Sequence, residues 1–257
     1  MNMRKPEWYR KGIPFYEKKT EADYRKDPYE HYDDMVIRQV ALHLADELWG
    51  AYPMQAVLDF AKPHCRVAPN DCILEIGCGV GRWIGHLAQA HPSAQCWGID
   101  YSYQMLQQAN RFWRQGETLD LDYRHKGFSK KLNKAGHRLQ NLQLGLAKAS
   151  HLPFEDHSQD WVLSSFLLDR LDDPIKGLLE MYRVLKPQGQ VIAISPLNFA
   201  KATHWDKYYP PNQFAQVLKQ LGFELLHWQE DILIKEPIDF HGNAVIWNCL
   251  GMVLGKD

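Results

Sequence analysis

A short apolar run that ends in a glycine-rich loop is the feature that most constrains the fold of this chain. Residues 73–83 read Ile-Leu-Glu-Ile-Gly-Cys-Gly-Val-Gly-Arg-Trp, with glycines at positions 77, 79 and 81. A helical pattern follows at once, so the run predicts a buried strand, a tight turn and a helix. Because a side chain in such a turn would collide with a ligand, the glycines let a ligand lie directly on the backbone.

Strand and helix patterns alternate through the body of the chain. Strands are expected near 72–76, 95–99, 142–146, 161–166 and 191–195, with helices at 82–90, from Ser102 onward, at 175–184 and at 212–221. Ser102 is expected to cap its helix. The alternation predicts an α/β fold with a mostly parallel sheet and helices on both faces. The last two strands, near 223–228 and 244–254, have only a loop between them and should form an antiparallel hairpin.

Two segments lie outside this alternation. Residues 1–62 combine an irregular aromatic arm, with little core of its own, and two helices separated by Pro53, ahead of a main domain at 63–257. Residues 111–141 hold eight Lys and Arg against three acids and predict an insertion. The insertion is either a lid or basic patch for an anionic molecule, or a solvated surface excursion.

Composition excludes several classes of protein. The net charge of −1 gives no general attraction to nucleic acid or to an anionic membrane. The N-terminus has no apolar signal segment, and no run of 18 apolar residues is present. The five cysteines lack metal-like spacing and indicate reduced thiols. We therefore expect a cytoplasmic monomer or homodimer without a membrane or nucleic-acid partner, and no metal site.

Four stretches together resemble the class I S-adenosylmethionine-dependent methyltransferases, especially the small-molecule subgroup typified by quinone-biosynthesis enzymes. In chain order they are Glu75 to Gly81, Trp97 to Ser102, Ala147 to Phe154 and Asp160 to Pro174, within residues 70–196. The resemblance implies a Rossmann-like sheet of seven strands, five parallel strands plus the terminal hairpin, and S-adenosylmethionine as cofactor. A nicotinamide-dependent oxidoreductase is disfavoured, because the dinucleotide fingerprint needs a glycine where this chain has Arg82.

The resemblance also implies a cofactor site, covered in part by residues 1–62. An acid at position 100, nineteen residues after Gly81, suits a grip on two ribose hydroxyls. Lys148 stands where the family usually has an aspartate for the adenine amino group, so either the backbone alone holds adenine or Lys148 points to solvent. The residues expected to contact the cofactor are Glu75, Gly77, Cys78, Gly79, Gly81, Asp100, Tyr101, Met105, Ala149, Ser150, Ser165, Phe166 and Tyr32.

The predicted function is methyl transfer to a small-molecule acceptor by in-line displacement. Many relatives carry a histidine pair where this chain has Asp169 and Arg170, so Asp169 is a candidate base, unless it simply pairs with Arg170 or solvent. His204, after the fifth strand, is a second candidate base or a surface histidine. The alternative function is a cofactor-binding protein of the same fold that is non-catalytic or regulatory. A nucleic-acid methyltransferase is disfavoured by net charge and by a missing Asn/Asp-Pro-Pro-aromatic motif.

Overall fold

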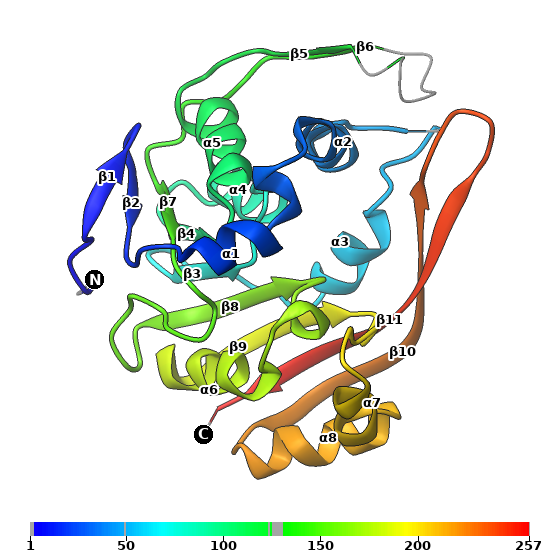
Figure 1. The fold of residues 1–257 in the computed structure, drawn as a ribbon. Helices are drawn as coiled ribbons and strands as arrows, with labels where there is room; N and C mark the ends of the chain where they lie inside the picture. Colours follow the sequence, from blue (N-terminus) through cyan, green and yellow to red (C-terminus); the bar gives the residue numbers. More distant parts are fainter. Residues whose placement is uncertain (1–2, 49, 123, 125–130, 257) are drawn as a thin grey trace.

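The computed structural model describes residues 3–48, 50–122, 124 and 131–256. Its centre is one nine-stranded sheet with the order β1-β2-β7-β4-β3-β8-β9-β11-β10 (Figure 1). A separate two-stranded sheet, β5 with β6, lies outside it. The central sheet is mostly parallel, as the alternating sequence pattern predicted.

Five parallel strands form the middle of the sheet. They are β7 (Leu142–Leu146), β4 (Gln95–Asp100), β3 (Cys72–Ile76), β8 (Gln159–Ser165) and β9 (Leu185–Ser195). β11 (Ala244–Gly255) runs antiparallel to β9 and forms a long hairpin with β10 (Glu224–Pro237). The predicted parallel core and the terminal antiparallel hairpin are both confirmed.

The N-terminal arm corrects two expectations. The short strands β1 (Trp8–Arg10) and β2 (Ile13–Phe15) form a hairpin, and Phe15 of β2 pairs with Leu146 of β7. The central sheet therefore has nine strands, two more than the seven expected. The arm also contributes to the core, because Ile13, Phe15 and Tyr16 are buried. Strands of three residues are too short to show the alternation that identifies a strand in a sequence.

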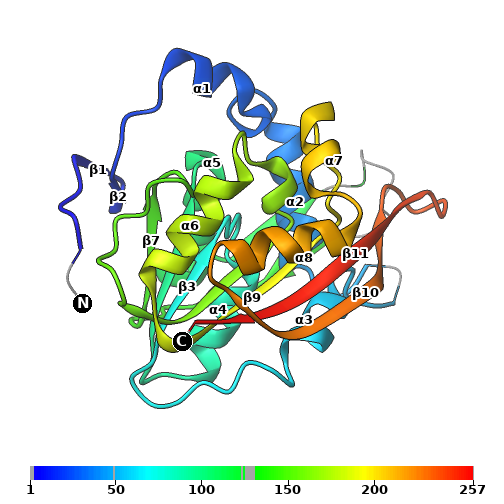
Figure 2. The same ribbon diagram turned by 90° about the horizontal axis from the view of Figure 1, so that it is seen from below.

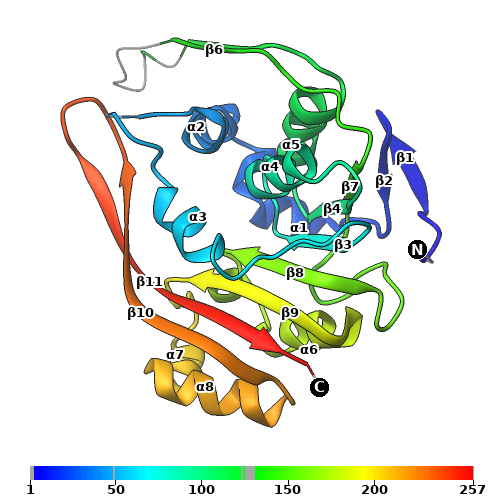
Figure 3. The same ribbon diagram turned by 180° about the vertical axis from the view of Figure 1, so that it is seen from behind.

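Helices cover both faces of the sheet (Figures 2 and 3). One face carries α2 (Asp33–Leu44), α3 (Gln55–Ala61), α4 (Arg82–Ala90) and α5 (Tyr103–Ala109), and the other carries α6 (Pro174–Val184), α7 (Ala202–Tyr208) and α8 (Pro211–Gln220). Each face of the sheet has its own hydrophobic core. Along β9, Ile192 and Ile194 pack in the core with α2 to α5, and Val191 and Ala193 pack in the core with α6 and α8. Alternate side chains of a strand point to opposite faces, so one apolar strand supplies both cores. In the described ranges no helix has both the length and the apolar character that crossing a bilayer requires.

The expected insertion at 111–141 begins later than predicted. Helix α5 continues as a π-helical turn, Asn110–Arg114, in which Phe112 and Trp113 are fully buried. After this turn the chain forms the hairpin of β5 (Leu119–Asp122) and β6 (Lys131–Lys134), which contributes the buried Leu119 to the core. Residues 123 and 125–130, including Gly127 of the predicted insertion, lie outside the described residues. Whether the insertion acts as a lid or a basic patch, or is only a solvated surface excursion, stays a prediction.

Candidate functional site

A cavity of about 490 Å³ lies at the carboxyl ends of β3, β4 and β8. This edge of a parallel sheet is where open α/β folds bind ligands. One part of the lining comes from the loop after β3 and from the last residues of β4 and β8. The other part comes from α2, α3 and the β10–β11 hairpin, and includes Gln39, Leu42, His43, Tyr52, Met54, Val57, Leu58, Glu236 and Trp247.

The glycine loop presents bare backbone to the cavity. Gly77 and Gly79 line it with φ angles of +71° and +52°, a left-handed conformation that residues with side chains rarely adopt. A Cβ at Gly77 would lie 3.0 Å from Leu167, so the loop and the segment after β8 are in close contact. The Gly77 N–H also donates to the Ile99 carbonyl over 2.8 Å, which fixes the loop to β4.

Asp100 joins this loop to the end of β4. Its carboxylate accepts one hydrogen bond from the Gly79 N–H (2.7 Å) and one from the Ser102 N–H (2.8 Å). Burial raises the pKa of Asp100, and the two backbone donors oppose that shift. A carboxylate offers about four lone-pair sites, so two acceptor positions remain for a ligand diol. The Ser102 hydroxyl does not cap α5 as expected, since it makes no cap bond and lacks a partner among the described residues.

Glu75 organises the start of α4 from inside the fold. Its buried carboxylate accepts the Ile84 N–H over 3.0 Å, and the same residue lines the cavity. Burial raises the pKa of Glu75 to about 8, against the opposing effect of that hydrogen bond. Glu75 therefore lies beside the loop, as expected, and its carboxyl also accepts one of the N–H groups that are left without a partner at the start of α4.

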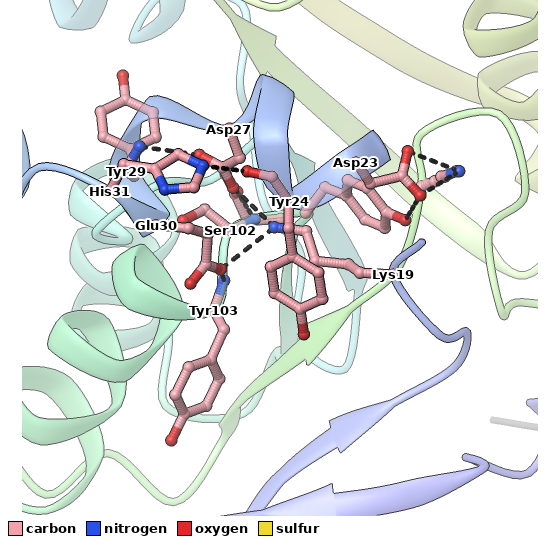
Figure 4. A network of polar contacts seen from close by, with 12 residues as sticks. Lys19, Asp23, Tyr24, Asp27, Tyr29, Glu30, His31, Ser102 and Tyr103 are labelled. Carbon is pink, nitrogen blue, oxygen red and sulfur yellow. Dashed lines mark hydrogen bonds and ion pairs between the residues drawn. The ribbon is translucent and has the colours of Figure 1, made fainter. Parts of the chain in front are cut away.

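A strap formed by residues 17–30 crosses the ends of β4 and β7 and contains α1 (Glu21–Lys26) and a 3₁₀ turn, Pro28–Glu30. Its Lys19 ammonium is buried and binds Asp27 (2.7 Å) and Glu30 (3.2 Å), as Figure 4 shows. Glu30 in turn accepts the Tyr103 N–H at the start of α5 (3.2 Å). The strap is thus held to the main domain through one buried cation and its two acids.

A second set of contacts joins the strap to the segment after β7. Asp23 accepts a hydrogen bond from the Tyr101 hydroxyl (2.9 Å) and lies 3.3 Å from the Lys148 ammonium. The Lys148 backbone N–H donates to Glu17 over 2.6 Å. Two alternatives were considered: that the backbone alone holds adenine, or that Lys148 points to solvent. The structure instead shows Lys148 bound by the strap.

Lys19→Met is expected to loosen the strap, because it leaves Asp27 and Glu30 without their buried counter-ion. Breaking a buried ion set costs about 3 kcal/mol. Hydrogen exchange of the strap amides should therefore accelerate by roughly a hundredfold, while the central strands keep their protection. Lys18→Met, at an exposed neighbouring position, is the matched control. Equal protection of the strap in both variants would contradict the structural role of Lys19.

The wall opposite the loop contains groups that the sequence reasoning missed. Gln39 and His43 lie one turn apart on α2, and the His43 Nε2 is 3.1 Å from the Gln39 Oε1. Arg82, buried at the start of α4, reaches the Leu44 carbonyl (3.4 Å) and lies over the Tyr52 ring at 4.5 Å. The i, i+4 spacing of Gln39 and His43 was a visible signal, but the family resemblance does not extend to α2.

The structure brings together eight of the expected cofactor residues. Those that line the cavity are Glu75, Gly77, Cys78, Gly79, Asp100, Met105, Ser165 and Phe166. The expected residues outside the described lining are Gly81, Tyr101, Ala149, Ser150 and Tyr32. Tyr32 is 61% exposed at the start of α2, and Tyr29 lines the cavity in its place. Among the described side chains, no group of three or more potential ligands is placed to hold a metal ion.

Neither expected catalytic residue lines the cavity. Asp169 is buried and accepts a hydrogen bond from the Ser195 hydroxyl (2.8 Å), which ties the end of β9 to the turn after β8. His204 is buried in α7 between Phe199 and Tyr208, with ring centroids 5.8 and 5.4 Å away. Asp169 was alternatively expected to pair with Arg170 or solvent, and His204 to lie on the surface; the structure shows neither arrangement. Their catalytic roles stay predictions that this geometry does not test.

Comparison with known proteins points in the same direction as the geometry. Residues 74–193 match a family described as a methyltransferase domain. The chain is 33% identical over 159 residues to a demethylmenaquinone methyltransferase of Lactobacillus johnsonii, covering 60% of this chain and 57% of that protein. It is 28% identical over 186 residues to the ubiquinone/menaquinone biosynthesis C-methyltransferase UbiE of Geotalea daltonii, covering 69% of each. The chain spans 57% to 61% of the length of the first three curated relatives.

Solved structures share the fold at lower identity. Phosphoethanolamine N-methyltransferase 2 of Haemonchus contortus, in complex with S-adenosyl-L-methionine, matches with a TM-score of 0.57 at 18% identity, over 85% of this chain and 47% of that chain. A SAM-dependent methyltransferase from Aquifex aeolicus matches with a TM-score of 0.50 at 16% identity, over 87% and 98%. These similarities place the sheet and its helices in the Rossmann-like methyltransferase fold.

Proposed function

We propose that this chain is a class I S-adenosylmethionine-dependent methyltransferase and that it methylates a flat, hydroxylated aromatic molecule. The observation that carries the proposal is a single cavity with two unlike walls. One wall is the backbone loop with Asp100, which suits a polar nucleoside. The other is aromatic and suits an apolar acceptor, so one cavity can hold both reactants next to each other.

The loop wall fits the cofactor. S-adenosylmethionine supplies an electrophilic methyl group on a charged sulfur. Gly77 and Gly79 line the cavity with left-handed backbone that carries no side chain, and Asp100 keeps acceptor positions for the ribose hydroxyls. Met105, Ser165 and Phe166 complete the lining of this part. Gly81, Tyr101, Ala149, Ser150 and Tyr32 remain proposed contacts, and the strap together with residues 31–62 is proposed to cover the cofactor.

The aromatic wall favours the acceptor class. Its rings offer apolar faces on which a planar ring can stack. They are Tyr29, Tyr52, Trp83 and Trp247, and the Trp247 ring packs edge-on against Phe166 of the loop wall. Two of the similar proteins named above act, by their names, on demethylmenaquinone or in quinone biosynthesis. A reduced naphthoquinone ring is therefore the first acceptor to test.

Most of the rate acceleration is proposed to come from positioning. Holding the acceptor carbon and the methyl group in line at near-attack distance removes the entropic cost of their encounter. The apolar side chains around the acceptor also exclude water, which keeps the nucleophile unsolvated. No stabilisation of a developing anion is needed at the leaving group, since the sulfur departs neutral.

The test uses the full chain, methyl-labelled S-adenosylmethionine and 1,4-naphthalenediol kept under reducing conditions. Label should appear in the ring product, and 2,3-dimethyl-1,4-naphthalenediol, which has no free position on the hydroxylated ring, should give none. Cofactor binding by calorimetry without transfer to any acceptor would instead support a non-catalytic, cofactor-binding protein. Absence of cofactor binding would overturn both.

A further inference from the structure

We propose that His43 is the proton acceptor of this site, and that it takes the proton of a hydroxyl group on the bound acceptor. The inference rests on the proposed methyl transfer and narrows its substrate class. An acceptor that needs His43 must carry an ionisable hydroxyl, as a phenol or quinol does. A thioether or a tertiary amine would have no proton for the histidine to remove.

The position of His43 supplies the first step of the argument. It lies in the last turn of α2 and lines the cavity together with Gln39, four residues earlier. The same cavity contains the glycine loop and Phe166, so the imidazole and the cofactor part of the site open on one space. Figure 1 shows α2 on the same side of the sheet as α4 and α5.

The contact with Gln39 assigns the tautomer of the ring. The Gln39 amide is oriented with its Oε1, an acceptor, 3.1 Å from the His43 Nε2, so this nitrogen is assigned as the donor. A neutral imidazole with a proton on Nε2 has a bare Nδ1. Among the described residues that nitrogen has no hydrogen-bond partner, so it is the atom that can receive a proton. Gln39 is therefore a positioning residue for His43.

The other candidate bases of the described cavity lining are already engaged. Glu75 accepts the Ile84 N–H, and Asp100 accepts two backbone N–H groups. Glu236 accepts from Arg38 (2.9 Å) and from the Trp247 indole N–H (2.8 Å). Burial raises the pKa of Glu75 to about 8, so this carboxyl is mostly protonated at pH 7 and cannot accept a further proton. Asp100 and Glu236 are each held by two donors that fix neighbouring segments of the cavity wall. His43 keeps one nitrogen uncommitted.

The surroundings keep the His43 ring uncharged at neutral pH, which leaves one ring nitrogen open but lowers its proton affinity. Burial, followed by the positive charge of Arg82 at the start of α4, lowers the pKa of His43 to about 4. Asp46, beyond the end of α2, binds Arg82 (3.3 Å) and the Lys134 ammonium (2.5 Å), and so offsets part of this positive charge. As the hydroxyl proton leaves, the negative oxygen raises the proton affinity of the adjacent imidazole.

The proposed step is balanced within this chain and its acceptor. The acceptor O–H bond breaks, its electron pair stays on the acceptor, and an N–H bond forms at Nδ1 of His43. The added electron density makes the acceptor ring a better nucleophile. The ring carbon that takes the methyl group then loses its own proton to water while the oxygen regains one, which restores the aromatic diol. His43 returns the proton to water once the product has left.

The first test compares His43→Gln with His86→Gln, using 1,4-naphthalenediol. His86 is partly buried, has its pKa lowered to about 4, and packs on Trp113 outside the described cavity lining. We expect His43→Gln to lower turnover at pH 7 by at least roughly a hundredfold. Its rate should then rise about tenfold per pH unit toward the pKa of the acceptor hydroxyl, because only pre-ionised acceptor reacts. Wild type and His86→Gln should stay flat from pH 6 upward.

A second measurement does not depend on turnover. Nitrogen-15 NMR of histidine-labelled protein should show His43 neutral at pH 6, protonated on Nε2 and bare on Nδ1. Adding 4-nitrophenol as a probe should shift the Nδ1 signal of His43 and leave His86 unchanged. A charged His43, a proton on Nδ1, or an unshifted signal with the probe bound would overturn the inference.

The two proposals fail in different ways. If wild type and His43→Gln methylate at equal rates with the same pH profile, the role of His43 is refuted and methyl transfer stands. If neither methylates anything but the probe shifts Nδ1, the histidine site stands and the proposed function fails. Calorimetry with the cofactor should give the same affinity for both proteins, since His43 lies on the acceptor wall.

Discussion

Asp100→Ala should lower the affinity for S-adenosylmethionine at least about a hundredfold while the protein remains folded. The carboxylate is expected to accept two ribose hydroxyls, and charge-assisted hydrogen bonds contribute about 1.5–3 kcal/mol each. A loss of about 3 kcal/mol corresponds to roughly two powers of ten in affinity. The substitution also releases the Gly79 and Ser102 N–H groups, so the loop loses one of its links to β4 and keeps the Gly77 bond to the Ile99 carbonyl.

Calorimetric titration with the cofactor measures this effect, with circular dichroism to verify the fold. Asp120→Ala, at an exposed position on β5, is the matched control and should bind normally. The cofactor affinity of Asp100→Asn should fall between those of wild type and Asp100→Ala. Its amide oxygen can still accept one backbone N–H, while its NH₂ group faces the other. Unchanged affinity in Asp100→Ala would remove the ribose assignment and with it the main support for the cofactor site.

Trp113→Ala should destabilise the protein by about 4 kcal/mol, the largest effect expected for a single side chain here. The indole is fully buried, and its N–H donates to the Val80 carbonyl inside the glycine loop (3.0 Å). It also lies directly beneath α4, where a Cβ on Gly85 would come within 2.5 Å of the ring. The substitution removes both the packing surface of the helix and the anchor of the loop.

Urea denaturation gives the change in unfolding free energy. Trp8→Ala, on the exposed strand β1, should cost under about 1 kcal/mol and serves as the control. Gly85→Ala should also be destabilising on its own, but much less so in the Trp113→Ala background, because the clash partner is gone. Additive effects of the two substitutions would contradict the contact between the helix and the indole.

The core of the fold could be read from local patterns. The strand at 72–76, the helix at 82–90 and the strand at 142–146 have the predicted bounds. These elements depend on neighbours in sequence, since burial periodicity and glycines in a turn are properties of short segments. The position of Asp100 at a strand end followed from the same local pattern, and it lies at the cavity as expected.

Other features could not be read in this way. The π-helical turn that buries Trp113 interrupts the helical period, so Phe112 and Trp113 were assigned to a polar insertion. The strap depends on an ion pair set that joins residue 19 to residues 27 and 30 and then to residue 103. Charges in a sequence do not reveal which of them will be buried together.

The sequence by itself determined the parallel sheet, the bare-backbone loop and the carboxylate beside it, because each is encoded within about a dozen consecutive residues. Only the tertiary structure decided what faces that loop. It brought Gln39 and His43 of α2 to the cavity, placed Asp169 and His204 elsewhere, and laid the strap over Tyr101 and Lys148. These placements follow from packing between segments distant along the chain, which no local periodicity records.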